Sequence, residues 1–139
     1  MTFSTEGGEK TRFLNVDLDI YSKANLRPLV AALGKEVFAL HLGREGGLWS
    51  AHLELSEEPK NADAAIRCFA ALVRALPPTK RRLWDAAVTR DFNIGVQAGS
   101  RPHAREIKLS PGTVQKVASL KARLVVTVYA PPAPSNAGR

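Results

Sequence analysis

Two histidines and three carboxylates occupy alternating positions in segments with β-strand patterns. His41 and His52 lie in two adjacent alternating runs, and Asp17, Asp19 and Glu54 alternate with apolar residues. Imidazole and carboxylate groups together could bind a divalent transition metal or carry out acid–base catalysis. Antiparallel sheets commonly leave one polar face in solvent, so the same pattern also fits an ordinary hydrated surface.

Tyrosines and mixed polar groups on such a face suit contact with another protein. The residues predicted to bind a partner on the open sheet face are Asn15, Asp17, Asp19, Tyr21, His41, His52, Glu54 and Tyr129. The sequence contains no phosphate loop, no G-x-S-x-G elbow, no H-E-x-x-H and no paired-cysteine zinc pattern. We therefore predict no catalytic residue, metal or cofactor, and keep an enzyme or metal site on the His41/His52/Asp17 face as an alternative.

The net charge of +7 is concentrated in the second half of the chain. Residues 1–76 hold nine Lys and Arg against ten Asp and Glu, whereas residues 77–139 hold eleven against three. The predicted basic patch comprises Lys80, Arg81, Arg82, Arg90, Arg101, Arg105 and Lys108. Clustered cations fit phosphate groups, so nucleic-acid binding is a second alternative. Because Asp17 and Asp19 would repel a phosphate backbone from the sheet face, a protein partner is preferred.

The strand predicted over residues 13–22 must position the first of these sites. Val16, Leu18 and Ile20 alternate with polar residues, so an extended strand sends the three apolar side chains to a core. The remaining elements are expected to pair beside this strand or to cover its apolar face.

A β-hairpin is predicted next, from alternating runs at residues 37–42 and 48–55 around a glycine-rich turn. In the first run, Phe38, Leu40 and Leu42 alternate against His41 and are expected on the other face. In the second run, His52 and Glu54 alternate against the apolar positions and are expected on the polar face.

Capping residues and helical spacing predict four helices. They begin after Asn25, Asn61, Thr79 and Ser110, the last with proline at its first helical position. In the long helix after Asn61, Cys68 is expected to be a small packed side chain. Trp84 is expected to pack in the core, and Val88 to lie on the same buried side.

Further strands are predicted at residues 92–98 and 124–129, with a brief one at 107–109. Strand–helix–strand units at both ends of the chain would pack their helices on the sheet. The sequence therefore predicts an α+β fold: a two-layer ferredoxin-like sandwich with a mostly antiparallel sheet of about five strands and helices on one face.

Four features follow one another along the chain. They are the first strand Phe13-Leu-Asn-Val-Asp-Leu-Asp19, Trp49 at the start of the hairpin's second strand, the long helix, and the helix–strand pair from Leu109 to Tyr129. Together they resemble a small uncharacterised bacterial family of ferredoxin-like domains. The resemblance covers about residues 12–130. It implies a fold and brings no activity with it, because a shared fold does not carry function.

The chain length of 139 residues fits a single domain with its own core. We expect a flexible lead over residues 1–11, one α+β domain over 12–130 and a flexible proline-rich tail over 131–139. With no long apolar run, no signal-peptide core and one cysteine, a cytoplasmic location is predicted. The predicted function is a non-catalytic protein-binding module with a toxin-neutralising (immunity) or regulatory accessory role.

Overall fold

The structure is a computed structural model and describes residues 9–131. Its elements are β1 (Arg12–Ser22), α1 (Arg27–Leu33), β2 (Val37–Glu45), β3 (Leu48–Leu55), α2 (Ala62–Arg74), α3 (Pro78–Asp85), β4 (Thr89–Gln97), α4 (Pro111–Ser119) and β5 (Arg123–Tyr129). Over these residues the chain is α+β, with four helices and one five-stranded sheet. Most of the predicted lead and tail lies outside the described residues.

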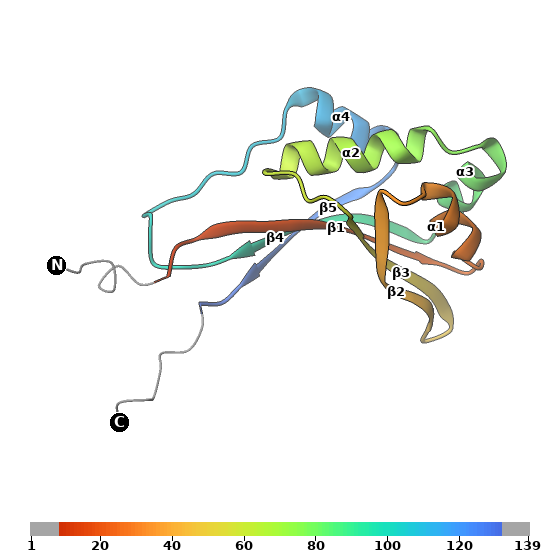
Figure 1. Ribbon diagram of the computed structural model, residues 1–139, viewed down its shortest axis with the longest axis horizontal. Helices are drawn as coiled ribbons and strands as arrows, with labels where there is room; N and C mark the ends of the chain where they lie inside the picture. The colour runs from red at the N-terminus through yellow and green to blue at the C-terminus, as the bar shows by residue number, and fades with distance from the viewer. Residues whose placement is uncertain (1–8, 132–139) are drawn as a thin grey trace.

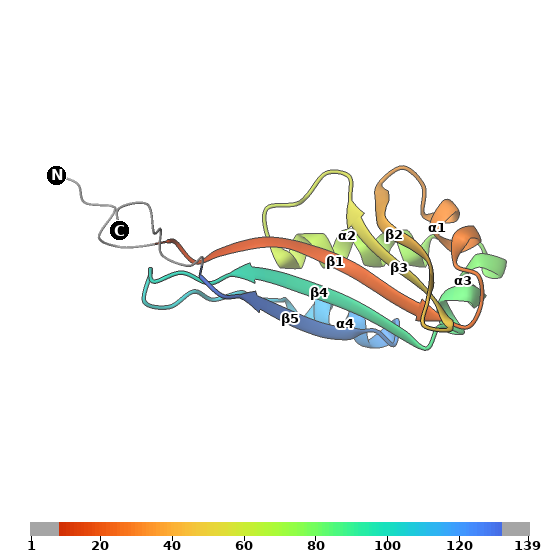
Figure 2. The ribbon, with the colours of Figure 1, turned by 90° about the horizontal axis from the view of Figure 1, so that it is seen from below.

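The sheet is mixed, and its strand order is β2-β3-β1-β4-β5. β1 pairs antiparallel with β3 and β4, β2 pairs antiparallel with β3, and β4 and β5 run parallel. Figure 1 shows α2 and α4 lying above the strands, and Figure 2 shows β1, β4 and β5 in front of these two helices. The brief strand predicted at residues 107–109 is wrong, because Ile107 and Leu109 pack against the core instead of pairing with a strand.

β1 supplies the centre of the core. Its alternate side chains Val16, Leu18 and Ile20 are fully buried, which confirms the face predicted from their spacing. They belong to one cluster with Phe69 of α2 and Phe92 of β4, whose rings lie 6.0 Å apart. Full burial of each aliphatic side chain stabilises the fold by about 1.5–3 kcal/mol, so β1 and α2 hold the two layers together.

The β2–β3 hairpin turns at Gly46 and Gly47, so β2 is longer than predicted, whereas β3 has the predicted bounds. Both glycines have positive φ, +61° and +88°, which a two-residue hairpin turn requires and which side chains disfavour. The right-handed twist of the two strands is compatible with such a turn.

The sides of the sheet predicted for the first residues of β2 are wrong. A register shift between Ala39 and His41 leaves Leu40 without a partner in the ladder, so β2 contains a bulge. Phe38 therefore pairs with Glu54 on the polar face, and Phe38 and Leu40 are 45% and 57% exposed. One extra residue reverses the alternation on one side of a bulge. Since residues 37–40 are all apolar, the sequence pattern did not reveal this reversal.

α2 begins where predicted. The Asn61 side chain accepts a 2.8 Å hydrogen bond from the backbone N–H of Ala64. Ile66, Phe69 and Val73 face the core, as their spacing predicts. The prediction that Cys68 is packed is wrong, because this position is on the exposed side of the helix, away from that stripe.

α3 starts at Pro78, before the predicted cap Thr79, and ends at Asp85. Trp84 is fully buried, and its Nε1–H donates to the carbonyl of Leu120 at 3.1 Å. Its predicted packing role is therefore confirmed. Val88 is exposed rather than buried, because the chain has left the helix and passes directly into β4.

α4 begins with the predicted cap, since the Ser110 hydroxyl accepts from the backbone N–H of Thr113 at 3.1 Å. The helix packs beside α2 and returns the chain to β5 at the edge of the sheet. Within residues 9–131, no helix has the length and apolar character needed to cross a membrane.

Candidate functional site

The polar side chains of β1, β2 and β3 form one surface, which we call the outer face. Cross-strand pairs bring Asp19 beside His52, His41 beside His52, and Phe38 beside Glu54. The residues of the outer face are Asn15, Asp17, Asp19, Tyr21, Phe38, His41, His52 and Glu54. Seven of the eight residues predicted for the partner-binding face thus lie together.

Tyr129, the eighth predicted residue, lies on the same side of the sheet but on the edge strand β5. It pairs with Gln97 of β4, which in turn pairs with Arg12 at the start of β1. Tyr21 is near the other end of β1, so the length of the strand separates the two tyrosines. At its own end of the sheet, Tyr129 lies two residues beyond Thr127, which is in register with Gly95, the partner of Asn15.

Carboxylate and aromatic side chains surround the imidazole ring of His52. Its Nδ1 forms a 2.9 Å hydrogen bond with Oδ1 of Asp19, and its Nε2 lies 3.8 Å from Oε1 of Glu45. The Tyr21 ring meets the imidazole edge-on, with ring centroids 5.7 Å apart. These contacts fix the orientation of the imidazole ring on the outer face.

His41 lies against His52 with ring centroids 5.4 Å apart. Nε2 of His41 is shielded from solvent and has no hydrogen-bond partner in the structure. Across the described part of the chain, no group of three or more His, Cys, Asp or Glu side chains is arranged to hold a metal ion. The carboxylates that contact His52 are Asp19 and Glu45 rather than Asp17, so the structure brings the two histidines together with other carboxylates than the predicted one.

Two carboxylates contact the side chain of Asn15. Its Nδ2 group donates to Oδ1 of Asp17 at 2.9 Å and to Oε2 of Glu54 at 3.0 Å. Burial, followed by the charges of Glu54 and Asp19, raises the pKa of Asp17 to about 6. Burial, followed by the charges of Glu54 and Asp17, raises the pKa of Glu58 to about 7. At neutral pH these carboxylates therefore carry negative charges that burial and mutual repulsion destabilise in the folded state.

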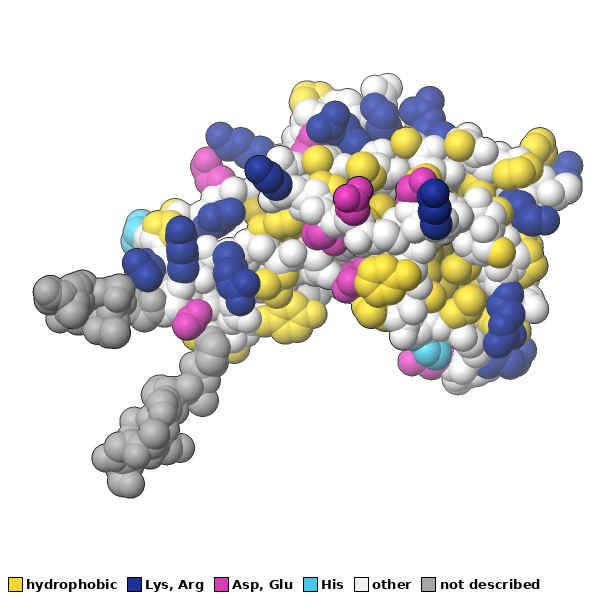
Figure 3. All heavy atoms as spheres, viewed as in Figure 1, with side chains coloured by type: hydrophobic (Ala, Val, Ile, Leu, Met, Phe, Trp, Pro, Cys, Tyr) yellow, Lys and Arg dark blue, Asp and Glu magenta, His cyan; other side chains and the backbone are white. Residues whose placement is uncertain are grey.

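Phe38 is the residue of this surface that the sequence patterns missed. Its exposed ring lies directly across from Glu54, and Leu40 beside it is also exposed. Figure 3 shows exposed hydrophobic side chains next to acidic ones in the lower half of the molecule. An exposed aromatic group beside carboxylates gives the outer face both apolar and charged contacts to offer.

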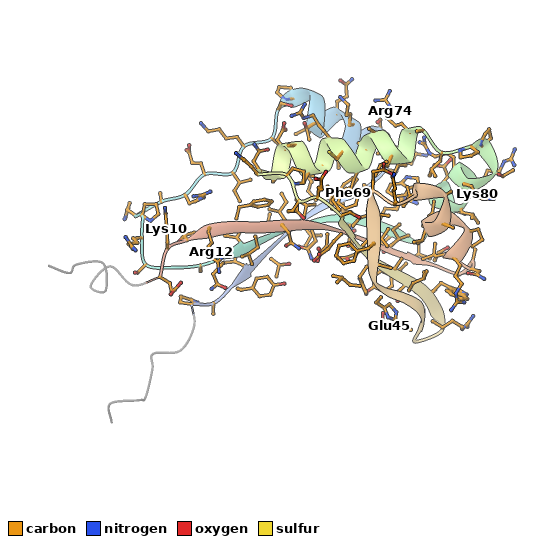
Figure 4. All side chains as sticks on the ribbon, in the orientation of Figure 1. Lys10, Arg12, Glu45, Phe69, Arg74 and Lys80 are labelled. Atoms are coloured by element: carbon orange, nitrogen blue, oxygen red, sulfur yellow. The ribbon has the colours of Figure 1, made fainter. Side chains whose placement is uncertain are left out.

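The predicted basic patch is divided into two groups by the length of β4. Lys80, Arg81 and Arg82 lie on α3, whereas Arg101, Arg105 and Lys108 lie in the connection between β4 and α4. In Figure 4 the labelled Lys80 is at one end of the molecule, and Lys10 and Arg12 are at the other. Nine strand residues span about 30 Å at ~3.3 Å each, so the two groups do not form one patch.

Arg90 has a structural role instead. Its Nη1 group donates to the carbonyls of Trp84 at 2.9 Å and Ala87 at 3.0 Å, and its Nε donates to that of Lys121 at 3.1 Å. The three carbonyls lie at or just after the C-terminal ends of α3 and α4, where helices leave carbonyls without intrahelical partners. Arg90 thus holds α3 against the start of β5.

A pocket of about 490 Å³ lies away from the outer face. It is lined by Lys35, Glu36, Leu55, Ser56, Glu57, Cys68, Ala71 and Leu72. None of the outer-face residues contributes to this pocket, so it is not part of the candidate site.

No protein-family model matches the chain, and neither a curated protein nor a solved structure is detectably similar to it.

Proposed function

We propose that this chain is a non-catalytic, cytoplasmic protein-binding module that contacts its partner through the outer face. The observation that carries the proposal is the exposed Phe38 ring beside a carboxylate cluster with no basic counterpart. Among residues 9–131, no lysine or arginine forms an ion pair with Asp17, Asp19 or Glu54. A partner that brings cations and apolar groups would neutralise the cluster and cover the ring.

A toxin-neutralising (immunity) or regulatory accessory role fits this surface. Proteins of these kinds act by covering a surface of their partner, and they need no reactive group of their own. The partner expected from the outer face has a basic contact surface with apolar positions, because charge complementarity speeds association and excludes wrong partners.

A ferredoxin-like arrangement of the first four strands is part of the proposal. The order β2-β3-β1-β4, with antiparallel pairing throughout, supports it. With the helices covering the other side of the sheet, as the view in Figure 2 supports, the outer face would remain open to a partner.

The test is affinity capture from native lysate with matched variants. Phe38→Ser and Glu54→Lys should lower recovery of a stoichiometric partner by about tenfold or more, as expected for residues central to an interface. Val88→Ser is the control, because Val88 is equally exposed but lies outside the outer face. Full recovery with both outer-face variants, or no stoichiometric partner at all, would contradict the proposal.

Nucleic-acid binding is the second candidate, and one observation favours it. The β4–α4 connection bearing Arg105 and Lys108 also pairs with the chain start, through the bridge between Lys10 and Arg101. Arg12 follows on β1, so Lys10, Arg12 and Arg101 lie together at one end of the molecule, where Figure 3 shows several Lys and Arg side chains.

This candidate predicts affinity for single-stranded oligonucleotides that falls steeply as salt rises. Replacing Arg105 and Lys108 by alanine should reduce the salt slope by about one unit per lost phosphate contact. The matched control replaces Arg81 and Arg82 on α3 by alanine. Comparing the two double variants shows which basic group binds the oligonucleotide. Absence of binding at low salt would remove nucleic acid as a ligand.

A further inference from the structure

The edge strand β5 is exposed on the side of the sheet that carries the core. Through their pairing with Phe92, Ile94 and Val96 of β4, the β5 residues Leu124, Val126 and Val128 lie on that same side. Their β4 neighbours are buried, yet these three are 40%, 58% and 61% exposed. The helical layer therefore does not cover the outermost strand, and an apolar row remains in solvent.

The free backbone groups of β5 belong to the same three residues. The carbonyl of Tyr129 accepts from the N–H of Ala98 at 2.9 Å, so Tyr129 directs its polar backbone groups toward β4. Residues along a strand alternate in this respect, so Leu124, Val126 and Val128 direct theirs away from the sheet. One edge thus presents three unpaired N–H and three unpaired C=O groups next to three exposed aliphatic side chains.

β5 lacks the features that commonly protect an edge strand. Such strands usually carry inward-pointing charges, proline or a bulge that prevents further pairing. The seven residues of β5 pair with β4 in continuous register, and the strand contains neither proline nor lysine. Its one charged residue, Arg123, is held by both carboxylate oxygens of Asp91, at 2.7 and 2.8 Å.

We propose that β5 pairs antiparallel with β5 of a second copy, across a two-fold axis at Val126. In this register Val126 faces Val126 of the second copy and Leu124 faces Val128. These are the residues whose backbone groups are free, so all six N–H and C=O groups on each edge find partners. The two five-stranded sheets become one continuous sheet, and six aliphatic side chains form a single row.

Charge favours a second copy as the occupant of this edge. In the same register Arg123 lies opposite Tyr129, and Val125 lies opposite Thr127, so no like charges meet across the axis. An arginine beside an aromatic ring is an attractive pair. An isologous contact of this kind closes on itself and stops at two copies. The outer faces on β1, β2 and β3 stay free in the pair.

Mass measurement tests the pairing. At tens of micromolar, light scattering coupled to gel filtration should give about twice the chain mass of 15.1 kDa. Val126→Lys should give the single-chain mass, because two lysines would face each other at the axis. Val114→Lys is the matched control on α4, where the valine is similarly exposed but outside β5, and it should leave the double mass unchanged.

Disulfide trapping tests the register, in a Cys68→Ser background that removes the exposed native thiol. With an added oxidant, Val126→Cys should cross-link two copies, because directly opposite Cα atoms lie about 5.5 Å apart, within disulfide reach. Val128→Cys should not cross-link to itself, since its counterpart is offset by four residues, about 13 Å along the strand. A single-chain mass for the unmodified protein, a double mass that survives Val126→Lys, or equal cross-linking at both positions would overturn the proposal.

Discussion

The guanidinium of Arg123 binds both carboxylate oxygens of Asp91, at 2.7 and 2.8 Å, and thereby fastens the edge strand β5 to β4. Asp91 is buried, whereas Arg123 is largely exposed. The side-chain hydrogen bond to Asp91 and its negative charge raise the pKa of Arg123 above its usual value, so the cation persists throughout the accessible pH range. The pair stabilises the register of the parallel strands β4 and β5. It also neutralises the charge of Arg123, which would otherwise oppose pairing of another strand at this edge.

Replacing Asp91 with asparagine should release Arg123. Because the arginine is mostly solvated, we expect only a small loss in the free energy of unfolding. The unpaired cation on β5 should also weaken association of two copies. Chemical denaturation and light scattering measure these effects, and Arg81→Ala, which breaks the exposed pair with Asp85, is a control expected to cost about 0.5 kcal/mol or less. An unchanged monomer–dimer equilibrium in Asp91→Asn would contradict the second expectation.

Stability should fall as pH rises from about 4 to about 7. Asp17 and Glu58 have pKa values raised to about 6 and about 7, so between pH 4 and 7 the folded state binds more protons than the unfolded state. Their contribution is therefore full below about pH 4, declines between pH 4 and 7, and is lost at pH 8. Asp17→Asn should raise the unfolding midpoint most at pH 8 and less at pH 5, and so flatten the profile between them. Thermal unfolding across this pH range measures the effect.

Below pH 4 the opposite trend should appear. A hydrogen bond from Ser50 lowers the pKa of Glu45, and hydrogen bonds involving Thr113 and Ser110 lower that of Asp63. Groups with lowered pKa values stabilise the fold above their unfolded pKa and lose that contribution as they protonate. A stability profile that rises steadily from pH 5 to pH 8 would show that the Asp17 cluster is not arranged as described.

The bulge in β2 makes Phe38 and Leu53 respond differently to truncation. Phe38→Ala should change the free energy of unfolding by about 0.5 kcal/mol or less, because the ring is exposed. Leu53→Ala on β3 should cost about 2–5 kcal/mol, as for other buried leucines. Denaturant titration compares them directly. A large loss for Phe38→Ala would mean that the ring faces the core, as simple alternation predicts.

Trp84 joins α3 to the segment that leads into β5. Trp84→Phe keeps most of the buried ring but leaves the Leu120 carbonyl without its 3.1 Å hydrogen bond, at a cost of about 1–3 kcal/mol. Trp84→Ala should cost about 3–5 kcal/mol because it also opens a cavity. Calorimetric unfolding separates these values. Equal stability of Trp84→Phe and the unmodified chain would show that the hydrogen bond contributes nothing.

The alternation of Val16, Leu18 and Ile20, the caps Asn61 and Ser110, and the stripe of α2 were predictable from the sequence alone. Each depends on the chemistry of residues within one or two turns of each other. By contrast, the bulge at Leu40 and the exposure of Val88 depend on how distant segments pair and where a helix ends. No local pattern contains that information.

The sequence by itself determined the element types, most of their ends and the acidic character of β1. Only the tertiary structure decided that Phe38 joins the acidic face, that Arg90 binds carbonyls, and that β5 is an open edge. The physical reason is that these properties arise from pairing between segments far apart in the chain, such as Asp91 with Arg123. Spacing along one strand does not specify which strand lies beside it, or whether a helix covers it.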